Sequence, residues 1–286
     1  MAGIHCKACC MNMNSAHLRC NENALDALQP TWLASASAAD ASPPRTRKEA
    51  TMVCERAPGD SGLINKIFPD MSSAMAGIAD GATVMISGFG SAGMPSALID
   101  ALIAQGAGDL TIVNNNAGNG ETGLAALLAA GRVRKIICSF PRQTDSQVFD
   151  GLYRSGKIDL ELTPQGNLAE RIRAAGAGIG GFFTATGYGT QLAEGKETRL
   201  INGRHYVLES PIHADVALIK AWKADRWGNL IYRKAARNFG PIMAMAAKCT
   251  IAQVDHVVPL GELDPEVIVT PGIFVQRVVH VPGDSQ

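Results

Sequence analysis

The chain has 286 residues, 47% of them hydrophobic, and a formal net charge of zero. Neutrality gives no electrostatic signature of nucleic-acid or anionic-membrane binding. No apolar run approaches the roughly 18 residues that a transmembrane helix needs. Abundant glycine (30 residues) and few aromatics (5%) favour an α/β protein over a β-sandwich.

Residues 1–62 show no sustained helical or strand period and no apolar core of a secretory signal. We expect an extension that is disordered, or translated from upstream of a true start near Leu63. Five cysteines fall in this segment, and the Cys6-x2-Cys9-Cys10 cluster lacks a second ligand pair at finger spacing, so no metal site is predicted. The other two, Cys138 and Cys249, lie in apolar strand-like runs and are expected to be buried, unreactive thiols.

From residue 63 onward, short apolar runs alternate with helical patterns. The predicted strands are 83–86, 110–113, 133–139 and 158–162, and the predicted helices are 72–78, 96–104, 123–130, 145–154 and 168–175. This alternation predicts βαβ units and an open, mostly parallel sheet with helices on both faces.

The later part of the chain changes character. An Asn202-Gly203 pair within 198–208 predicts a β-hairpin. A buried strand over 214–222, a turn and strand over 225–232, a helix over 235–247 and a strand over 273–281 follow. We expect one folded domain over residues 63–282.

A glycine-rich turn between the strand 83–86 and the helix 96–104 is the most informative stretch. Gly88, Gly90 and Gly93 match G-x-G-x-x-G, the turn that receives a pyrophosphate in dinucleotide-binding folds. That interpretation needs an acidic residue about 20 residues on, at the end of the second strand. Asparagines occupy 114–116 instead, so a nicotinamide or flavin site is not favoured, and a merely structural tight turn is the plain alternative.

The stretch 80–95 resembles the first motif of the family I CoA-transferases, in which an Asp/Asn-Gly pair precedes an apolar strand, Gly-Gly-Phe and a Gly-x-Pro ending. Ser87 departs from it, standing where the first glycine of Gly-Gly-Phe is usual, and would be strained if the position required a positive φ. Further blocks occur in family order and extend the resemblance over roughly 63–281: 115–118 (NNAG), 163–173 (TPQGNLAERIR), 186–190 (TGYGT) and 233–239 (RKAARNF).

The resemblance implies transfer of CoA between carboxylic acids by a ping-pong route through a glutamyl-CoA intermediate. The family's nucleophilic glutamate lies in a Glu-Asn-Gly motif, which this chain lacks. Its own Glu121, Glu170 and Glu194 stand in other contexts and are expected on the surface. The resemblance therefore implies a cytoplasmic A-type subunit that is inactive without a B-type subunit, in a heterodimer or heterotetramer, and that needs no metal, ATP or redox cofactor.

The resemblance also assigns site residues. Gln165 is expected to donate its side-chain amide to the oxyanion; from the residues alone it would be a turn residue after Pro164. Asn115 and Asn116 follow a parallel strand, where open sheets place ligand contacts; they would otherwise be a polar turn. The glycine loop is expected to lie against acyl-CoA through Ser87, Gly88, Phe89, Gly90, Ser91, Ala92 and Gly93.

The run 140–143 (FPRQ) resembles the members that act on 3-oxoadipate, in bacterial aromatic-ring catabolism. 3-Oxoadipate carries a distal carboxylate that acetoacetate lacks, and a planar, bidentate guanidinium suits such a group. Arg142 is the candidate, with a solvated surface arginine as the equally weighted alternative. An acetoacetate or short-chain acid CoA-transferase, and a non-catalytic α/β ligand-binding domain, remain open alternatives.

Overall fold

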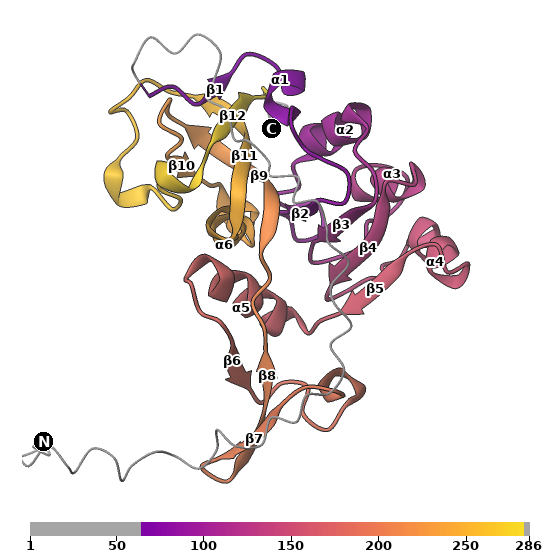
Figure 1. Ribbon diagram of the computed structural model, residues 1–286. Helices are drawn as coiled ribbons and strands as arrows, with labels where there is room; N and C mark the ends of the chain where they lie inside the picture. Colours follow the sequence, from indigo (N-terminus) through magenta and orange to yellow (C-terminus); the bar gives the residue numbers. More distant parts are fainter. Residues whose placement is uncertain (1–63, 283–286) are drawn as a thin grey trace, which may run out of the picture. The chain divides into compact units, whose positions relative to one another are not determined.

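The computed structural model describes residues 64–282 (Figure 1). The predictions for residues 1–62, including the cysteine cluster there, lie outside this part of the chain. Within it, the main sheet has nine strands. Eight of them follow the order β1-β12-β11-β9-β2-β3-β4-β5, and each neighbouring pair is parallel. The ninth strand, β10, pairs antiparallel with β9. The predicted open, mostly parallel sheet is confirmed.

The strands of this sheet are short except for two long ones near its centre. Their bounds are β1 Ile67–Phe68, β2 Thr83–Ile86, β3 Leu110–Val113, β4 Val133–Cys138, β5 Asp159–Leu162, β9 Ala214–Ala224, β10 Leu230–Ile231, β11 Ala247–Val257 and β12 Arg277–His280. The predicted bounds of β2 and β3 agree with these to the residue. The four residues of β3 are all buried, as is typical of a strand covered on both faces.

Helices cover both faces of the sheet, as predicted. Alternate residues of β2 separate the two cores: Val84 and Ile86 pack on one face, while Met85 packs on the other. The first core contains residues of α1 Met71–Met75, α2 Ser96–Gln105, α3 Leu124–Ala129 and α4 Gln147–Arg154. The second contains residues of α5 Gln165–Gly176 and α6 Gly240–Ala246.

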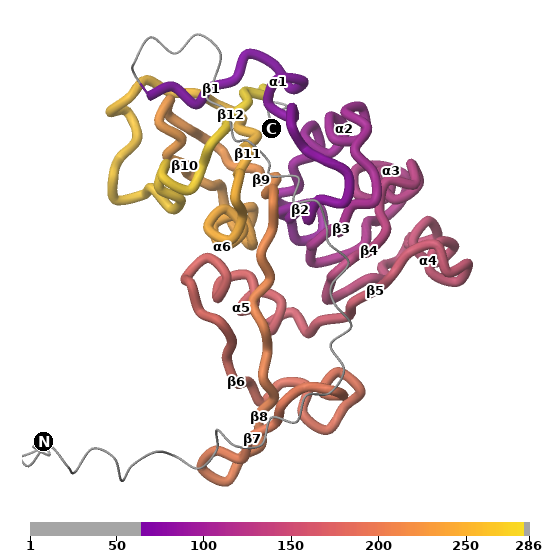
Figure 2. The backbone as a smooth tube through the Cα atoms, in the orientation of Figure 1, coloured from indigo at the N-terminus to yellow at the C-terminus, as the bar shows by residue number. Residues whose placement is uncertain are grey.

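A second, three-stranded antiparallel sheet joins β6 Phe182–Thr184, β8 Arg204–Glu209 and β7 Thr198–Ile201 in the order β6-β8-β7. The predicted hairpin is confirmed: Asn202 and Gly203 connect β7 to β8 with φ of 49° and 77°, the positive pair that a two-residue hairpin turn requires. Figure 2 shows the chain passing from α5 through β6 into this hairpin and returning through β8 directly into β9.

The helix predicted over 235–247 is wrong as a single element. It is divided into a 3-10 turn, η4 Lys234–Arg237, and α6. Asn238 between them has φ 3° and ψ −109°, far from helical values, and Pro241 restarts the helix in its first turn. A strand-like run was recognised around Cys249, but β11 was not among the predicted strands. It begins at Ala247, the residue that caps α6, without a turn residue to mark the change.

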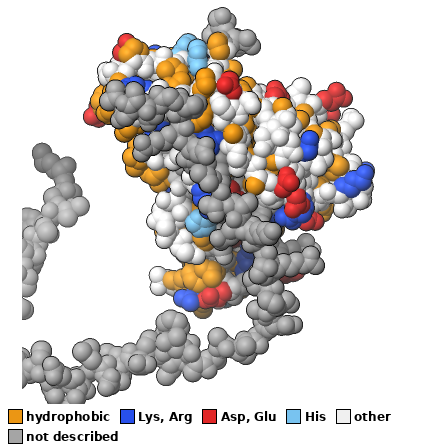
Figure 3. Space-filling view, turned by 45° about the horizontal axis from the view of Figure 1, so that its top comes forward, with side chains coloured by type: hydrophobic (Ala, Val, Ile, Leu, Met, Phe, Trp, Pro, Cys, Tyr) orange, Lys and Arg blue, Asp and Glu red, His pale blue; other side chains and the backbone are white. Residues whose placement is uncertain are grey.

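None of the helices in the described part of the chain has the length and apolarity that crossing a bilayer requires. On the face shown in Figure 3, acidic and basic side chains are interspersed rather than gathered into a patch of one sign. This distribution agrees with the formal net charge of zero.

Candidate active site

Four segments with predicted site residues meet at the carboxyl edge of the sheet. The glycine loop follows β2, the asparagines 114–116 follow β3, the run 139–142 follows β4, and Gln165 begins the helix after β5. Because β2, β3, β4 and β5 are parallel neighbours, the ends of all four strands lie side by side. This is the edge at which open α/β sheets bind ligands.

Ser87 is a fully buried residue that ties the glycine loop together. Its hydroxyl donates to the carbonyl oxygen of Gly93 at 2.7 Å and accepts from the backbone N–H of Lys220 at 3.2 Å. Among the described residues, the non-glycine positions with positive φ are Asp109, Asn202 and Lys234. Ser87 therefore adds no backbone strain, and its side chain supplies hydrogen bonds that a glycine could not.

The tip of the loop faces outward. Phe89 and Ala92 exchange two backbone hydrogen bonds of 3.0 and 3.2 Å, so Gly90 and Ser91 form a tight turn between them. Phe89, Gly90 and Ser91 are exposed, whereas Gly88 is buried. A ligand approaching this edge therefore meets residues 89–92 of the predicted binding loop, while residues 87, 88 and 93 hold it from beneath.

The base of the loop packs closely on η4. A Cβ added to Gly93 would lie 2.5 Å from the carbonyl oxygen of Ala236, so only glycine allows this approach. Asn238 completes the contact. Its side-chain oxygen accepts from the Gly88 N–H at 3.2 Å, and its side-chain nitrogen donates to the Ala92 carbonyl at 2.9 Å. Asn238 lies in the 233–239 block but was not among the predicted site residues.

The three asparagines after β3 have different environments. Asn114 is fully buried and donates to the Ile86 carbonyl at 2.6 Å, which links the ends of β2 and β3. Asn116 is also buried; its side-chain oxygen accepts from the Gly118 N–H, while its side-chain nitrogen has no hydrogen-bond partner within residues 64–282. Asn115 connects three strand ends, because its side-chain oxygen accepts from Gln165 at 2.7 Å and from Ser139 at 2.8 Å.

Gln165 is the first residue of α5 and is exposed. The helix was predicted to begin three residues later, at 168, so Gln165 lies in the first helical turn rather than before it. Its hydrogen bond to Asn115 positions the amide at the edge of the sheet. Pro164 caps this end of the helix without a side-chain hydrogen bond, and the partial positive charge of the helix N-terminus favours a nearby anion.

Arg142 lies on the loop that follows β4, with 57% of its side chain exposed. Its Nε donates to the Asp150 carboxylate at 2.8 Å, a contact that the sequence analysis did not foresee. Together with Asn119, Phe140 and Gln143 it borders an open hollow of about 370 Å³. The ion pair orients the guanidinium without occupying its two terminal nitrogens, for which the described residues provide no partner.

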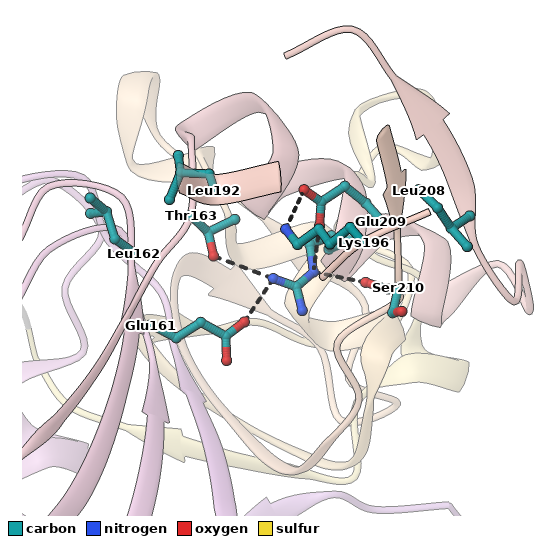
Figure 4. Close-up of a pocket in the computed structure, with 9 residues that line it drawn as sticks. Glu161, Leu162, Thr163, Leu192, Lys196, Leu208, Glu209 and Ser210 are labelled. Carbon is teal, nitrogen blue, oxygen red and sulfur yellow. Dashed lines mark hydrogen bonds and ion pairs between the residues drawn. The ribbon is translucent and has the colours of Figure 1, made fainter. Parts of the chain in front are cut away.

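A network of charged residues joins α5 to the small sheet (Figure 4). Arg171 of α5 donates to Glu161 at 2.9 Å and to the Ser210 carbonyl at 2.7 Å, and lies 3.7 Å from Glu209. Glu209, only 3% exposed, also accepts from Lys196 at 2.9 Å. A buried carboxylate needs such partners to remain charged. The network therefore fixes the helix that begins at Gln165 against the β7–β8 hairpin.

Glu161 is the member of this network that lies in β5 of the large sheet. Burial alone would raise its carboxyl pKa, but hydrogen bonds from Lys135 and Arg171, and the charges of both, together hold that pKa below its usual value. The Lys135 nitrogen lies 2.6 Å from the carboxylate. Glu161 is thus ionised at neutral pH as a structural partner.

The two described cysteines and the three glutamates singled out in the sequence lie where the sequence predicts. Cys138 and Cys249 are buried, as predicted, and burial raises the pKa of the Cys138 thiol to about 12. Glu170 pairs with Arg173 on the surface of α5, and Glu121 and Glu194 are not buried. Within residues 64–282, no group of three or more His, Cys, Asp or Glu side chains is placed to hold a metal ion.

The chain is similar to several known proteins. The family described as Coenzyme A transferase matches residues 68–281. The A-type subunit of 3-oxoadipate CoA-transferase from Pseudomonas putida is 75% identical over 221 residues, which cover 77% of this chain and 96% of that protein. The protein of the same name from Acinetobacter baylyi is 66% identical over 219 residues, with coverages of 77% and 96%. The crystal structure of glutaconate coenzyme A-transferase from Acidaminococcus fermentans shares the fold, with a TM-score of 0.65, 22% identity and 76% coverage of each chain.

Proposed function

Because the chain belongs to the coenzyme A transferase family, we propose that it is the A-type subunit of an enzyme that moves CoA from succinyl-CoA to 3-oxoadipate. The observation that carries the proposal is the 75% identity to the A-type subunit of a 3-oxoadipate CoA-transferase, over almost the whole of that protein. Residues 63–282 form the domain responsible. The reaction belongs to cytoplasmic catabolism of aromatic rings.

The proposed chemistry conserves the energy of one thioester bond, which is held in turn by a mixed anhydride and by a new thioester. A glutamate carboxylate of the partner chain attacks succinyl-CoA and forms a mixed anhydride as the CoA thiolate leaves. The thiolate then attacks the glutamyl carbonyl and releases succinate, and the enzyme-bound thioester passes CoA to 3-oxoadipate by the reverse sequence. Because no bond energy is lost, the reaction needs no metal, ATP or redox cofactor.

Gln165 supplies the oxyanion donor of each tetrahedral intermediate. Three observations support this role: its amide is exposed, Asn115 holds it at 2.7 Å, and it stands in the first turn of α5. A fixed donor beside a helix N-terminus stabilises developing negative charge without reorganising during the reaction. The outward tip of the glycine loop lies at the same edge of the sheet, and the backbone N–H groups of Gly90 and Ser91, between the paired Phe89 and Ala92, are presented to acyl-CoA.

Arg142 recognises the distal carboxylate of 3-oxoadipate. The hollow that it borders with Asn119 and Gln143 is polar and open, and the Asp150 ion pair holds the guanidinium in place. Two terminal nitrogens in a planar fork match the two oxygens of a carboxylate. Acetoacetate has no such group, so this contact separates the two substrate classes.

A B-type subunit completes the site at the carboxyl edge. The chain has no Glu-Asn-Gly, and its relatives are named as the A-type members of their enzymes. Three large apolar side chains on the segments that meet at this edge remain uncovered: Phe89 (53% exposed), Phe140 (59%) and Leu162 (44%). Such a group, at the ends of three parallel strands, is typical of a surface that another protein covers.

The experiment is co-expression with a chain containing Glu-Asn-Gly encoded in the adjacent reading frame. The complex is purified, and CoA transfer from succinyl-CoA to 3-oxoadipate and to acetoacetate is measured. We expect turnover by the complex, preference for 3-oxoadipate, and none by the isolated chain. A preference for acetoacetate would move the enzyme to the other substrate class, and binding without turnover would indicate a ligand-binding domain.

A further inference from the structure

The hydroxyl of Ser139 contacts the same side-chain oxygen as the Gln165 amide. Ser139 directly follows β4, and its Oγ lies 2.8 Å from Asn115 Oδ1 and 3.1 Å from the Asn115 carbonyl oxygen. Gln165, which follows the next strand of the sheet, reaches Asn115 Oδ1 at 2.7 Å. One buried amide oxygen therefore receives two donors, from residues 24 and 50 positions away.

Asn115 is 4% exposed, so its side chain depends on protein partners rather than on water. A serine hydroxyl both donates and accepts, and Ser139 Oγ also lies within reach of the Asn115 carbonyl oxygen, so it can bond the Asn115 amide in either orientation. The hydroxyl therefore fixes the position of the Asn115 side chain, to which Gln165 donates.

We propose that Ser139 is a positioning residue that holds the Gln165 amide in place through Asn115. The inference rests on the proposed function, because it concerns the oxyanion donor of that reaction. With Ser139 in place, Gln165 Nε2 donates one hydrogen to Asn115, and its second hydrogen remains for the oxyanion. Without the hydroxyl, the Asn115 side chain loses one of the two donors to its oxygen and can leave the position in which it holds Gln165.

A displaced Gln165 amide cannot reach the oxyanion, so only the fraction of enzyme with the amide in place turns over. Replacing Ser139 by alanine is expected to lower kcat by about 2- to 10-fold, which corresponds to the loss of one neutral hydrogen bond. The KM for succinyl-CoA should change by less than about twofold, because the donor acts mainly in the transition state. Threonine retains the hydroxyl, so Ser139→Thr should recover most of the loss.

The decisive measurement is a double-mutant cycle in the assembled complex. Ser139→Ala is compared in the wild-type background and in the Gln165→Ala background, with Ser155→Ala, an exposed serine at the end of α4, as the matched control. If Ser139 acts through Gln165, its removal lowers kcat in the first background and has no effect in the second.

An equal loss in both backgrounds, an unchanged kcat in both, or a raised KM at constant kcat would overturn the inference while leaving the proposed function intact. Failure of Ser139→Thr to recover activity, with an unfolding midpoint equal to that of the wild type, would also overturn it. Absence of CoA transfer by the wild-type complex would refute the proposed function itself, and the inference with it.

Discussion

The side-chain oxygen of Asn238 accepts a hydrogen bond of 3.2 Å from the backbone N–H of Gly88, a residue 150 positions earlier. The same amide donates to the carbonyl oxygens of Ala92 and Ala235, each at 2.9 Å. Its oxygen and nitrogen both have definite partners, so the amide cannot turn without losing them. Asn238 thereby holds the glycine loop on η4 at the edge of the proposed site.

Replacing Asn238 by aspartate tests this contact. The carboxylate retains the acceptor for Gly88 but faces the Ala92 and Ala235 carbonyls without a donor, at an expected stability cost of about 1–3 kcal/mol. We also expect a raised KM for succinyl-CoA, because the loop tip loses its support. Urea unfolding and steady-state kinetics measure the two effects. Asn202→Asp, in a hairpin turn that accepts either residue, is the control and should change neither.

Gln165→Ala is expected to lower kcat by about 100- to 1000-fold, the typical loss for one oxyanion donor. The KM for succinyl-CoA should change little, and the unfolding midpoint should stay near that of the wild type because the side chain is exposed. Gln191→Ala, an exposed glutamine in η3 Gln191–Ala193, serves as the control. A kcat equal to that of the control would leave Gln165 as a helix-start residue only.

Arg142→Ala should reduce kcat/KM for 3-oxoadipate by about 10- to 150-fold, the equivalent of one hydrogen bond to a charged group. A loss near the lower end of this range is expected because the Arg142 side chain is more than half exposed, and water weakens its contact with a carboxylate. Activity with acetoacetate should barely change. Succinate is also a dicarboxylate, so the enzyme is loaded with CoA first and each acid is then added in a half-reaction.

The control for this experiment is Arg154→Ala, an exposed arginine in the last turn of α4. Equal losses for both acids would mean that Arg142 supports the fold or CoA rather than the distal carboxylate. An effect on neither acid would make it a solvated surface arginine.

Glu161→Gln is expected to destabilise the chain at neutral pH by about 1–2 kcal/mol, since it weakens charge-assisted bonds from Lys135 and Arg171. The folded-state pKa of Glu161 lies below its unfolded value, so the contribution is complete above the unfolded pKa, near 4.5, and disappears as pH falls through the folded pKa. Urea unfolding at pH 7 and in steps below pH 4.5 should therefore show the two proteins converging.

Glu170→Gln provides the comparison for that series. Its ion pair with Arg173 joins two side chains that are each nearly half exposed, so its removal should cost less than about 1 kcal/mol at neutral pH. If Glu161→Gln and Glu170→Gln were equally stable at neutral pH, the network around Arg171 would contribute no more than a surface pair.

Local features of this structure, such as strands and turns, could be predicted from the sequence, whereas contacts between distant residues mostly could not. The strand Leu110–Val113 is set by a short, mainly apolar run and the β7–β8 turn by Asn202-Gly203, and the structure agrees with both predictions. β11 was seen only as a strand-like run around Cys249, because a buried parallel strand directly after a helix has neither alternation nor a turn signal to give its bounds.

The site shows the same division. The convergence of the strand ends follows from parallel pairing and was predictable. The contacts of Ser139 with Asn115 and of Asn238 with Gly88 were not, because nothing in a local pattern indicates which distant polar side chain meets which. Arg142 was predicted as a site residue because a guanidinium suits the distal carboxylate of 3-oxoadipate. Its ion pair with Asp150 could not be predicted, because it depends on where α4 begins after the loop.

The position of β2 between β3 and β9 has a consequence for biosynthesis. Val84 pairs with Ile112 soon after both leave the ribosome, but its other neighbour, Val216, follows much later. Until β9 is synthesised, one edge of β2 has no strand partner, and the Ser87 hydroxyl lacks its hydrogen bond from the Lys220 N–H, 133 positions away. Strands β2 to β5 can thus form before the residues that hold the glycine loop are synthesised. In this interval the nascent chain has an unpaired edge at β2, and such an edge promotes aggregation. The proposed site is completed late, when Asn238 emerges.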